Sequence, residues 1–183
     1  MSMHHFALIA SGPDPDADDF EERFLRAGCD DATISVHKGA LLLSFTREAR
    51  CLSRALLGAV RDVQSAGARV LHVEPDHLVN LADIASRSNL GRAAVTAFMR
   101  GEQGKIFPVP IARVCSDSPL WDWVVVARWL YGNRPALGKG VSLRDVVTAR
   151  VMRQANLALA APAGQERVLS RRTARIRRID RLV

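Results

Sequence analysis

The sequence contains few of the residues that mark several large classes of protein. Its three cysteines, Cys29, Cys51 and Cys115, form no close pair and no metal-ligand spacing, and the five histidines show no His-x-x-x-His pattern. We therefore expect no metal site, and we interpret the cysteines as small buried hydrophobic residues of a protein in a reducing cytoplasm. No apolar run approaches the length of a membrane span, and residues 1–11 lack the basic start and cleavage site of a signal peptide.

Signals of catalysis are also missing. The chain has no phosphate-cradling glycine loop and no Gly-x-Ser-x-Gly turn around a nucleophile. Asp30 and Asp31 follow a helix-ending glycine and are typical of a charged turn, whereas Arg47 and Glu48 are candidates to cap the helix that follows. Because nothing in the sequence brings these carboxylates together, we expect no enzymatic activity and no cofactor.

The charge that is present has an uneven distribution. The net charge is +7 over 183 residues, yet residues 1–78 carry 8 Lys and Arg against 12 Asp and Glu. Residues 79–135 carry 7 against 4, and residues 136–183 carry 11 against 3. Since an acidic surface is repelled by phosphates, this change of sign places a nucleic-acid surface in the second half of the chain.

The segment from Asn80 to Gly101 has the pattern of a helix-turn-helix, whose second helix lies in the DNA major groove. Asn80 and Asp83 have nearly the spacing of a capping box, and Asn89 stands where the turn needs a positive φ. Val95 and Phe98 follow at helical spacing as the buried side of the second helix. The alternative is an ordinary helical hairpin packed in a core.

Outward-facing residues of this segment are the candidate DNA contacts, because base edges and phosphates would lie beyond them. The basic tail adds arginines that neutralise phosphates without reading the sequence. The predicted contacts are Arg87, Gly91, Arg92, Ala93, Thr96 and Arg100, followed by Lys105 and by Arg171, Arg172 and Arg175 of the tail.

The residues after Gly101 have the layout of a winged helix. A loop with Gly104 leads into Phe107-Pro108-Val109-Pro110, then Leu120-Trp121-Asp122-Trp123, and then a helix that ends in Arg128-Trp129-Leu130. This pattern resembles the small winged domains of the excisionase and AlpA-like regulators, distant relatives of the MerR type. We expect at least two of the three tryptophans in the core, with stacking on exposed bases as the alternative role.

A longer stretch, residues 28–130, resembles a family of bacterial helix-turn-helix proteins. The motifs that carry this resemblance are Gly28-Cys29-Asp30-Asp31-Ala32, Phe45-Thr46-Arg47-Glu48-Ala49, Val73-Glu74-Pro75 and Leu78-Val79. The resemblance implies DNA binding. One departure is the turn Asn89-Leu90-Gly91, in which Gly91 is a weaker helix cap than the Ser or Thr of the commoner turn.

The first 75 residues alternate between strand and helix patterns. Strands are expected at 5–11, 32–37, 41–45 and 69–73, with a tight turn at Lys38-Gly39. Helices are expected from Asp18 or Asp19 to Ala27, and over 52–63, where apolar residues recur on one face. This βαββαβ order predicts a ferredoxin-like domain.

The last 48 residues begin with a glycine-rich break and a helix opened by Ser142 and Asp145. The apolar stripe from Leu143 to Ala158 either packs on its own domain or pairs with a second copy. The helix ends near Ala160-Ala161-Pro162, and an arginine-rich arm, helical or disordered, follows.

Together these patterns predict an α+β protein with a ferredoxin-like domain at 1–75, a winged helix-turn-helix at 76–135 and a basic helical extension at 136–183. We expect a cytoplasmic, nucleoid-associated homodimer that binds double-stranded DNA as a bacterial transcription regulator. Two alternatives stay open: an excisionase-like DNA-bending factor, and an antitoxin-type module whose N-terminal domain binds a protein partner. A single helix-turn-helix per chain is the reason to expect a dimer.

Overall fold

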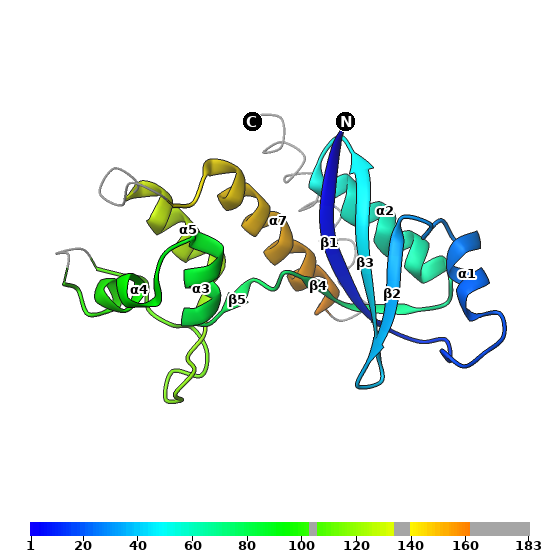
Figure 1. The fold of residues 1–183 in the computed structure, drawn as a ribbon, viewed down its shortest axis with the longest axis horizontal. Coiled ribbons are helices and arrows are strands. Elements are labelled where there is room, and N and C mark those ends of the chain that lie inside the picture. The colour runs from blue at the N-terminus through cyan, green and yellow to red at the C-terminus, as the bar shows by residue number, and fades with distance from the viewer. Residues whose placement is uncertain (103–105, 134–139, 162–183) are drawn as a thin grey trace. The chain divides into compact units, whose positions relative to one another are not determined.

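The computed structural model describes residues 1–102, 106–133 and 140–161, and the chain divides into two compact units (Figure 1). Of the described residues, the first unit contains Met1–Pro75 and 154–161, and the second contains those from Asp76 to Arg153. The described residues form a four-stranded antiparallel sheet, a two-stranded sheet and six helices. The expected α+β class is confirmed at this level.

In the first unit, strands and helices follow the order β1 (Ser2–Ser11), α1 (Phe20–Arg26), β2 (Ala32–His37), β3 (Ala40–Ala49), α2 (Leu52–Ser65) and β4 (Arg69–Glu74). The strands lie side by side in the order β2-β3-β1-β4, and every neighbouring pair is antiparallel. Lys38 and Gly39 have φ of 52° and 81°, so they form the two-residue turn expected between β2 and β3.

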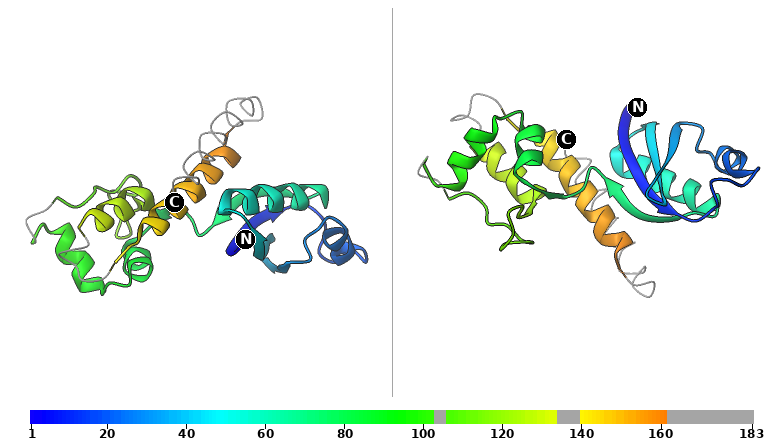
Figure 2. Two further views of the ribbon diagram at one scale, coloured as in Figure 1. Left: turned by 90° about the horizontal axis from the view of Figure 1, so that it is seen from above. Right: turned by 60° about the horizontal axis from the view of Figure 1, so that its bottom comes forward.

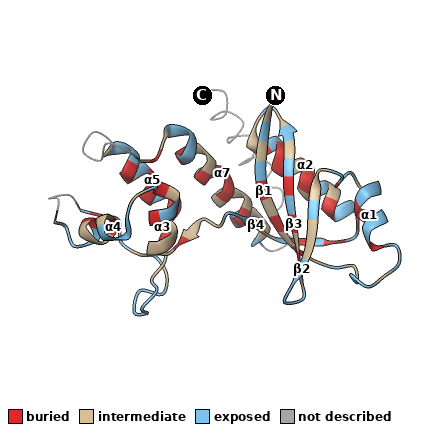
Figure 3. Ribbon diagram, viewed as in Figure 1, coloured by how far each residue is buried: buried red, intermediate tan, exposed pale blue. Residues whose placement is uncertain are grey.

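One face of this sheet forms the core of the unit. Alternate residues of β1 and β3 pair across the sheet, such as Leu8 with Leu43, and are buried on the same side (Figure 3). Helix α2 lies along the sheet (Figure 2) and buries one stripe of its surface there. The buried residues of the two strands and of α2 are Phe6, Leu8, Ala10, Leu41, Leu43, Phe45, Ser53, Ala55, Leu56, Ala59 and Val63.

Arg47 joins three parts of the first unit. Its guanidinium donates two hydrogen bonds to Asp31, at 2.6 and 2.8 Å, one to Asp62 of α2 at 2.6 Å, and one to the carbonyl of Gly28 at 2.9 Å. The hypothesis that Arg47 and Glu48 cap the following helix is therefore wrong. Strand β3 continues through Ala49, and the residue that caps α2, Cys51, makes no side-chain capping bond.

Charge around this network also acts on Cys29, which is buried as expected. Burial, and then the nearby Asp62 carboxylate, raise the pKa of the Cys29 thiol from 9.0 to about 11. The two aspartates hydrogen-bonded to Arg47 raise the pKa of its guanidinium. A buried protonated thiol has little nucleophilic character, so Cys29 serves packing here.

Cys51 is half-buried and Cys115 is exposed, so the expectation of three buried cysteines is wrong for these two.

The outer edge of β4 is occupied by a side chain of helix α7 (Leu143–Leu159). Asn156 is buried, and its amide accepts a bond from the N–H of Val73 at 2.7 Å and donates one to the carbonyl of Val73 at 2.9 Å. A β-bulge interrupts the pairing of β4 with β1 between Ile9 and Ala10. The side chain thus replaces a neighbouring strand at that point of the edge.

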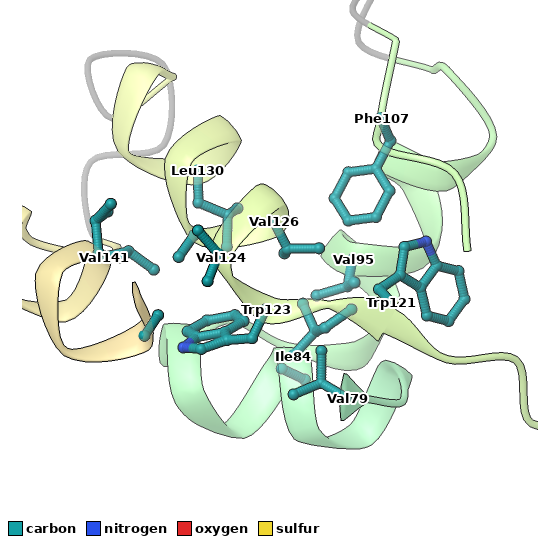
Figure 4. Packing of buried hydrophobic residues seen from close by; sticks show 14 of the residues in the cluster. Val79, Ile84, Val95, Phe107, Trp121, Trp123, Val124, Val126, Leu130 and Val141 are labelled. Carbon is teal, nitrogen blue, oxygen red and sulfur yellow. The ribbon is translucent and has the colours of Figure 1, made fainter. Parts of the chain in front are cut away.

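The second unit contains β5 (Leu78–Val79), α3 (Leu81–Ser88), α4 (Arg92–Met99), β6 (Trp121–Asp122), α5 (Trp123–Gly132) and α7 up to Arg153. Strands β5 and β6 pair in antiparallel fashion. A single hydrophobic cluster joins the three helices α3, α4 and α5 (Figure 4). Val141 belongs to the same cluster. Val146 and Ala149 of α7 belong to it as well, so part of the stripe that was a candidate for pairing between copies packs inside this unit.

No helix among the described residues is long and apolar enough to cross a membrane.

Candidate nucleic-acid interface

Helix α3 begins with the capping box that the sequence predicts. The side-chain oxygen of Asn80 accepts bonds from the backbone N–H groups of Ala82 and Asp83, at 2.8 and 3.0 Å. The carboxylate of Asp83 accepts the N–H of Asn80 at 2.9 Å. These reciprocal bonds satisfy backbone donors that a helix start leaves open, and they define where α3 begins.

The turn between α3 and α4 also follows the prediction. Asn89 adopts the left-handed conformation, with φ of 55°, and the N–H of Leu90 bonds back to the carbonyl of Ala85 at 3.0 Å. Gly91 precedes α4 and offers no side-chain cap. An abrupt turn of this kind lets two short helices cross closely, which the small Ala85 permits.

Val95 and Phe98 hold α4 in place. Both are buried and lie in one cluster with Ile84 and Ala85 of α3 (Figure 4). The hydroxyl of the buried Ser88 donates to the carbonyl of Ile84 at 2.6 Å, so this polar group is satisfied inside the unit. The orientation of α4 is therefore set by packing, and its opposite side is left to solvent.

The outward side of α4 contains most of the predicted contacts. Gly91, Arg92, Ala93 and Arg100 are exposed. Thr96 is half-buried, and its hydroxyl donates to the carbonyl of Arg92 at 3.0 Å. The Nη1 atom of Arg100 lies 3.7 Å from Oε1 of the exposed Glu102, and an exposed ion pair of this kind contributes little to stability. The guanidinium of Arg92 has no hydrogen-bond or ion-pair partner among the described residues.

Arg87 has a different environment from the other predicted contacts. Its guanidinium donates to the carbonyl of Asp76 at 2.6 Å and lies 5.7 Å from the ring centre of Trp123. Both contacts are with residues of the second unit, so the side chain ties the end of α3 to the start of that unit. Lys105, Arg171, Arg172 and Arg175, together with Gly104 of the expected wing, lie outside the described residues.

The chain after α4 is anchored by two tryptophans. The indole N–H of Trp129 donates to the carbonyl of Ile106 at 2.8 Å, and that of Trp121 donates to the carbonyl of Pro108 at 2.9 Å. The Trp129 ring also contacts Phe98 of α4 and Phe107, with centre-to-centre distances of 5.4 and 5.0 Å. This aromatic chain fixes the start of the loop relative to α4.

Burial confirms the expected role of two tryptophans. Trp121 and Trp123 lie in the hydrophobic core of the second unit, and Trp129 packs partly buried against it.

The second half of that loop closes into a small hairpin. Ala112 and Leu120 form an isolated antiparallel bridge, and Arg113, with φ of 51°, begins the exposed turn between them. Val109, Ile111 and Val114 are 74%, 58% and 62% exposed, so the hairpin presents apolar side chains to solvent. Arg113 was not among the contacts predicted from the sequence, although Asp117-Ser118-Pro119 before the apolar Leu120 is a turn signal only a few residues after it.

Among the described residues, no group of three or more His, Cys, Asp or Glu side chains could hold a metal ion. The exposed face of α4 and the hairpin closed by Ala112 and Leu120 offer guanidinium groups, backbone and apolar side chains. These are the groups that contact phosphates and base edges in protein–DNA complexes.

In comparisons with known proteins, no family model, no curated protein and no solved structure matches this chain.

Proposed function

We propose that the second unit binds double-stranded DNA sequence-specifically, with α4 in the major groove. The observation that carries this proposal is the outward face of α4. The exposed Arg92, whose guanidinium has no partner among the described residues, begins a short helix whose other side is fixed in the core, and the exposed Arg100 directly follows that helix. A guanidinium on a helix whose orientation is fixed in this way can donate to O6 and N7 of guanine, the commonest specific contact in the major groove.

The hairpin closed by Ala112 and Leu120 is our candidate for the wing. Its exposed Arg113 is suited to a phosphate or to the minor groove beside the helix. The aromatic chain from Phe98 through Trp129 to Phe107 supports this assignment, because it links the loop to α4. The second unit is then a winged helix-turn-helix of the excisionase and AlpA-like type.

For the first unit we propose the ferredoxin-like arrangement. The element order β1-α1-β2-β3-α2-β4 and the strand order β2-β3-β1-β4, antiparallel throughout, support it. Its role in the proposal is to assemble two copies or to bind a partner protein, and it has no catalytic role. The whole chain is then a cytoplasmic, nucleoid-associated transcription regulator.

Selection from random duplexes, followed by titration of the selected site, tests this function. Arg92→Ala should cost about 1–3 kcal/mol on the selected duplex and much less on a scrambled one, because only the specific complex contains the base contact. Arg128→Ala, at an exposed position of α5, is the control and should leave both affinities unchanged. Equal losses on the two duplexes would make Arg92 a phosphate contact, and no enrichment of any sequence would reject the function.

A second candidate is an architectural factor that bends DNA for a recombinase. The exposed Val114 beside Arg113 favours it, because apolar side chains next to arginines can wedge between base steps of the minor groove. Duplexes labelled at both ends separate the candidates by energy transfer. Shortening of the end-to-end distance on binding, removed by Val114→Ser but retained by Val125→Ser on α5, would identify the bending factor. An end-to-end distance that does not change on binding would reject the bending factor and leave the transcription regulator as the proposed function.

A further inference from the structure

The two edges of the four-stranded sheet differ in how they are protected. Strands β4 and β2 are the outer strands. On the β4 edge, Asn156 bonds to both backbone groups of Val73, a bulge interrupts the strand, and charged Arg69 and Glu74 stand at its ends. These are the devices by which proteins prevent an edge strand from pairing with another chain.

Within its six residues, strand β2 has none of these devices. Its sequence, Ala-Thr-Ile-Ser-Val-His, contains no proline and no Asp, Glu, Lys or Arg, and its register with β3 is continuous. No strand among the described residues pairs with its outer side. An uncharged, regular edge six residues long is a template for strand addition.

The alternation of hydrogen-bonded and non-hydrogen-bonded pairs between β2 and β3 shows which backbone groups of β2 lie on its outer edge. His37 and Ala40 close a two-residue turn, so their pair is hydrogen-bonded, and the bonded pairs then alternate along β2. The same alternation continues beyond β2, because the N–H of Thr46 donates to the carbonyl of Asp31 at 3.0 Å. The N–H and C=O groups of Thr33, Ser35 and His37 therefore face β3, and those of Ile34 and Val36 face outward.

Charges at the two ends of β2 indicate what would pair with it. Asp30, just before the strand, and Lys38, just after it, are both exposed. When two copies of β2 pair in antiparallel fashion, the Lys38 end of each copy lies beside the Asp30 end of the other. Parallel pairing would place like charges together instead. The edge is thus complementary to itself under a two-fold axis.

We propose that the chain forms a homodimer in which the β2 strands of two copies pair in antiparallel fashion, forming a continuous eight-stranded sheet. This dimer does not depend on DNA binding. It would provide two helix-turn-helix units if the second unit binds DNA, but a chain that binds no DNA would still dimerise through this edge.

A proline at position 36 tests the backbone pairing. Val36→Pro removes an outward N–H and no bond to β3, and proline is tolerated on edge strands in that orientation. Sedimentation of the full chain should show a concentration-dependent dimer that this variant loses. Val36→Thr keeps the N–H and the branched side chain, so it should still dimerise. A wild-type chain that stays monomeric, or a proline variant that dimerises normally, would overturn the proposal.

Charge exchange tests the antiparallel orientation. Asp30→Lys and Lys38→Asp should each raise the dissociation constant of the dimer by about threefold, since each places like charges across the interface. Asp is tolerated at the positive φ of position 38. The double variant Asp30→Lys/Lys38→Asp should recover wild-type affinity. Additive losses in the double variant would rule out this orientation.

Amide exchange of the wild-type chain gives a readout that does not depend on whether any variant folds. The amides of Ile34 and Val36 should be protected at high protein concentration and exposed on dilution, whereas those of Thr33 and Ser35, bonded to β3, should be protected throughout. Protection at Ile34 and Val36 that does not change with concentration would contradict pairing between copies.

Discussion

Arg47 shows at the scale of one residue what the sequence could and could not predict. The capping box of Asn80 and the left-handed Asn89 were predictable because all their partners lie within four residues. The carboxylate partners of Arg47, Asp31 and Asp62, are 16 and 15 residues away. They come together only when α2 packs on the sheet, so the sequence alone could not join them.

Substitution of Arg47 should destabilise the first unit strongly. Its side chain is only 13% exposed, and Arg47→Met would leave two carboxylates and the carbonyl of Gly28 without their donor. Because unpaired polar groups at a largely buried site are costly, we expect a loss of about 2–3 kcal/mol in the free energy of unfolding. Urea denaturation of the full chain, with circular dichroism as the signal, measures this loss.

Arg23 provides the control for that experiment. It pairs with Asp19 one helical turn away, at 2.7 Å, but both side chains are about half exposed. Arg23→Met should therefore change stability by less than about 0.5 kcal/mol. Equal small effects of the two substitutions would show that the Arg47 network contributes geometry without stability.

At the scale of elements, helix patterns were predictable and their packing partners were not. The apolar stripe of α7 is visible in the sequence, but equally suits packing inside the chain and pairing between chains. The structure places Val146 and Ala149 in the core of the second unit, while Leu143 and Leu157 are 46% and 45% exposed. Periodicity indicates which side of a helix is apolar, and only the tertiary contacts show what covers it.

For the loop after α4, the sequence predicted neither a pattern nor a position. Its Pro and Val residues gave no periodic pattern, and its position depends on two indole donors that lie 13 and 23 residues further along the chain. Such long-range side-chain bonds to loop carbonyls leave no local signal in a sequence. Two core tryptophans were predictable, but the role of Trp121 and Trp129 as anchors was not.

Trp129→Ala should therefore lower both the melting temperature and the affinity for the selected duplex. It removes the ring between Phe98 and Phe107 as well as the bond to the carbonyl of Ile106. Trp129→Phe retains an aromatic ring and loses only the donor, so its melting temperature should lie between those of wild type and Trp129→Ala. Thermal unfolding and duplex titration are measured on the same samples. Normal stability with lost binding would indicate that Trp129 stacks on bases instead.

At the scale of the whole molecule, an acidic first part, proposed to assemble two copies, is followed by a basic second half. Two copies joined through β2 would carry two helix-turn-helix units, as required for a site made of two half-sites. The acidic residues of 1–78 would repel phosphates, so the contacts with DNA would come from the second unit and from the arginines of the tail.

Salt dependence tests the contribution of the tail. Each phosphate neutralised by a cation contributes roughly −0.9 to the slope of log affinity against log salt concentration. Residues 165–183, which contain the predicted contacts Arg171, Arg172 and Arg175, include seven arginines. Their removal should flatten the slope markedly, because fewer counterions are then released on binding. Full-length and truncated chains are titrated on the selected and scrambled duplexes over a range of salt concentrations.

The ratio of the two affinities is the control in this titration. Phosphate contacts carry no sequence information, so truncation should weaken binding to both duplexes by the same factor and leave their ratio unchanged. A ratio that falls with truncation would mean that tail arginines read bases in a groove. An unchanged slope would mean that the tail does not contact DNA, and its seven arginines would then be available to an acidic protein partner, whose binding the same truncation should abolish.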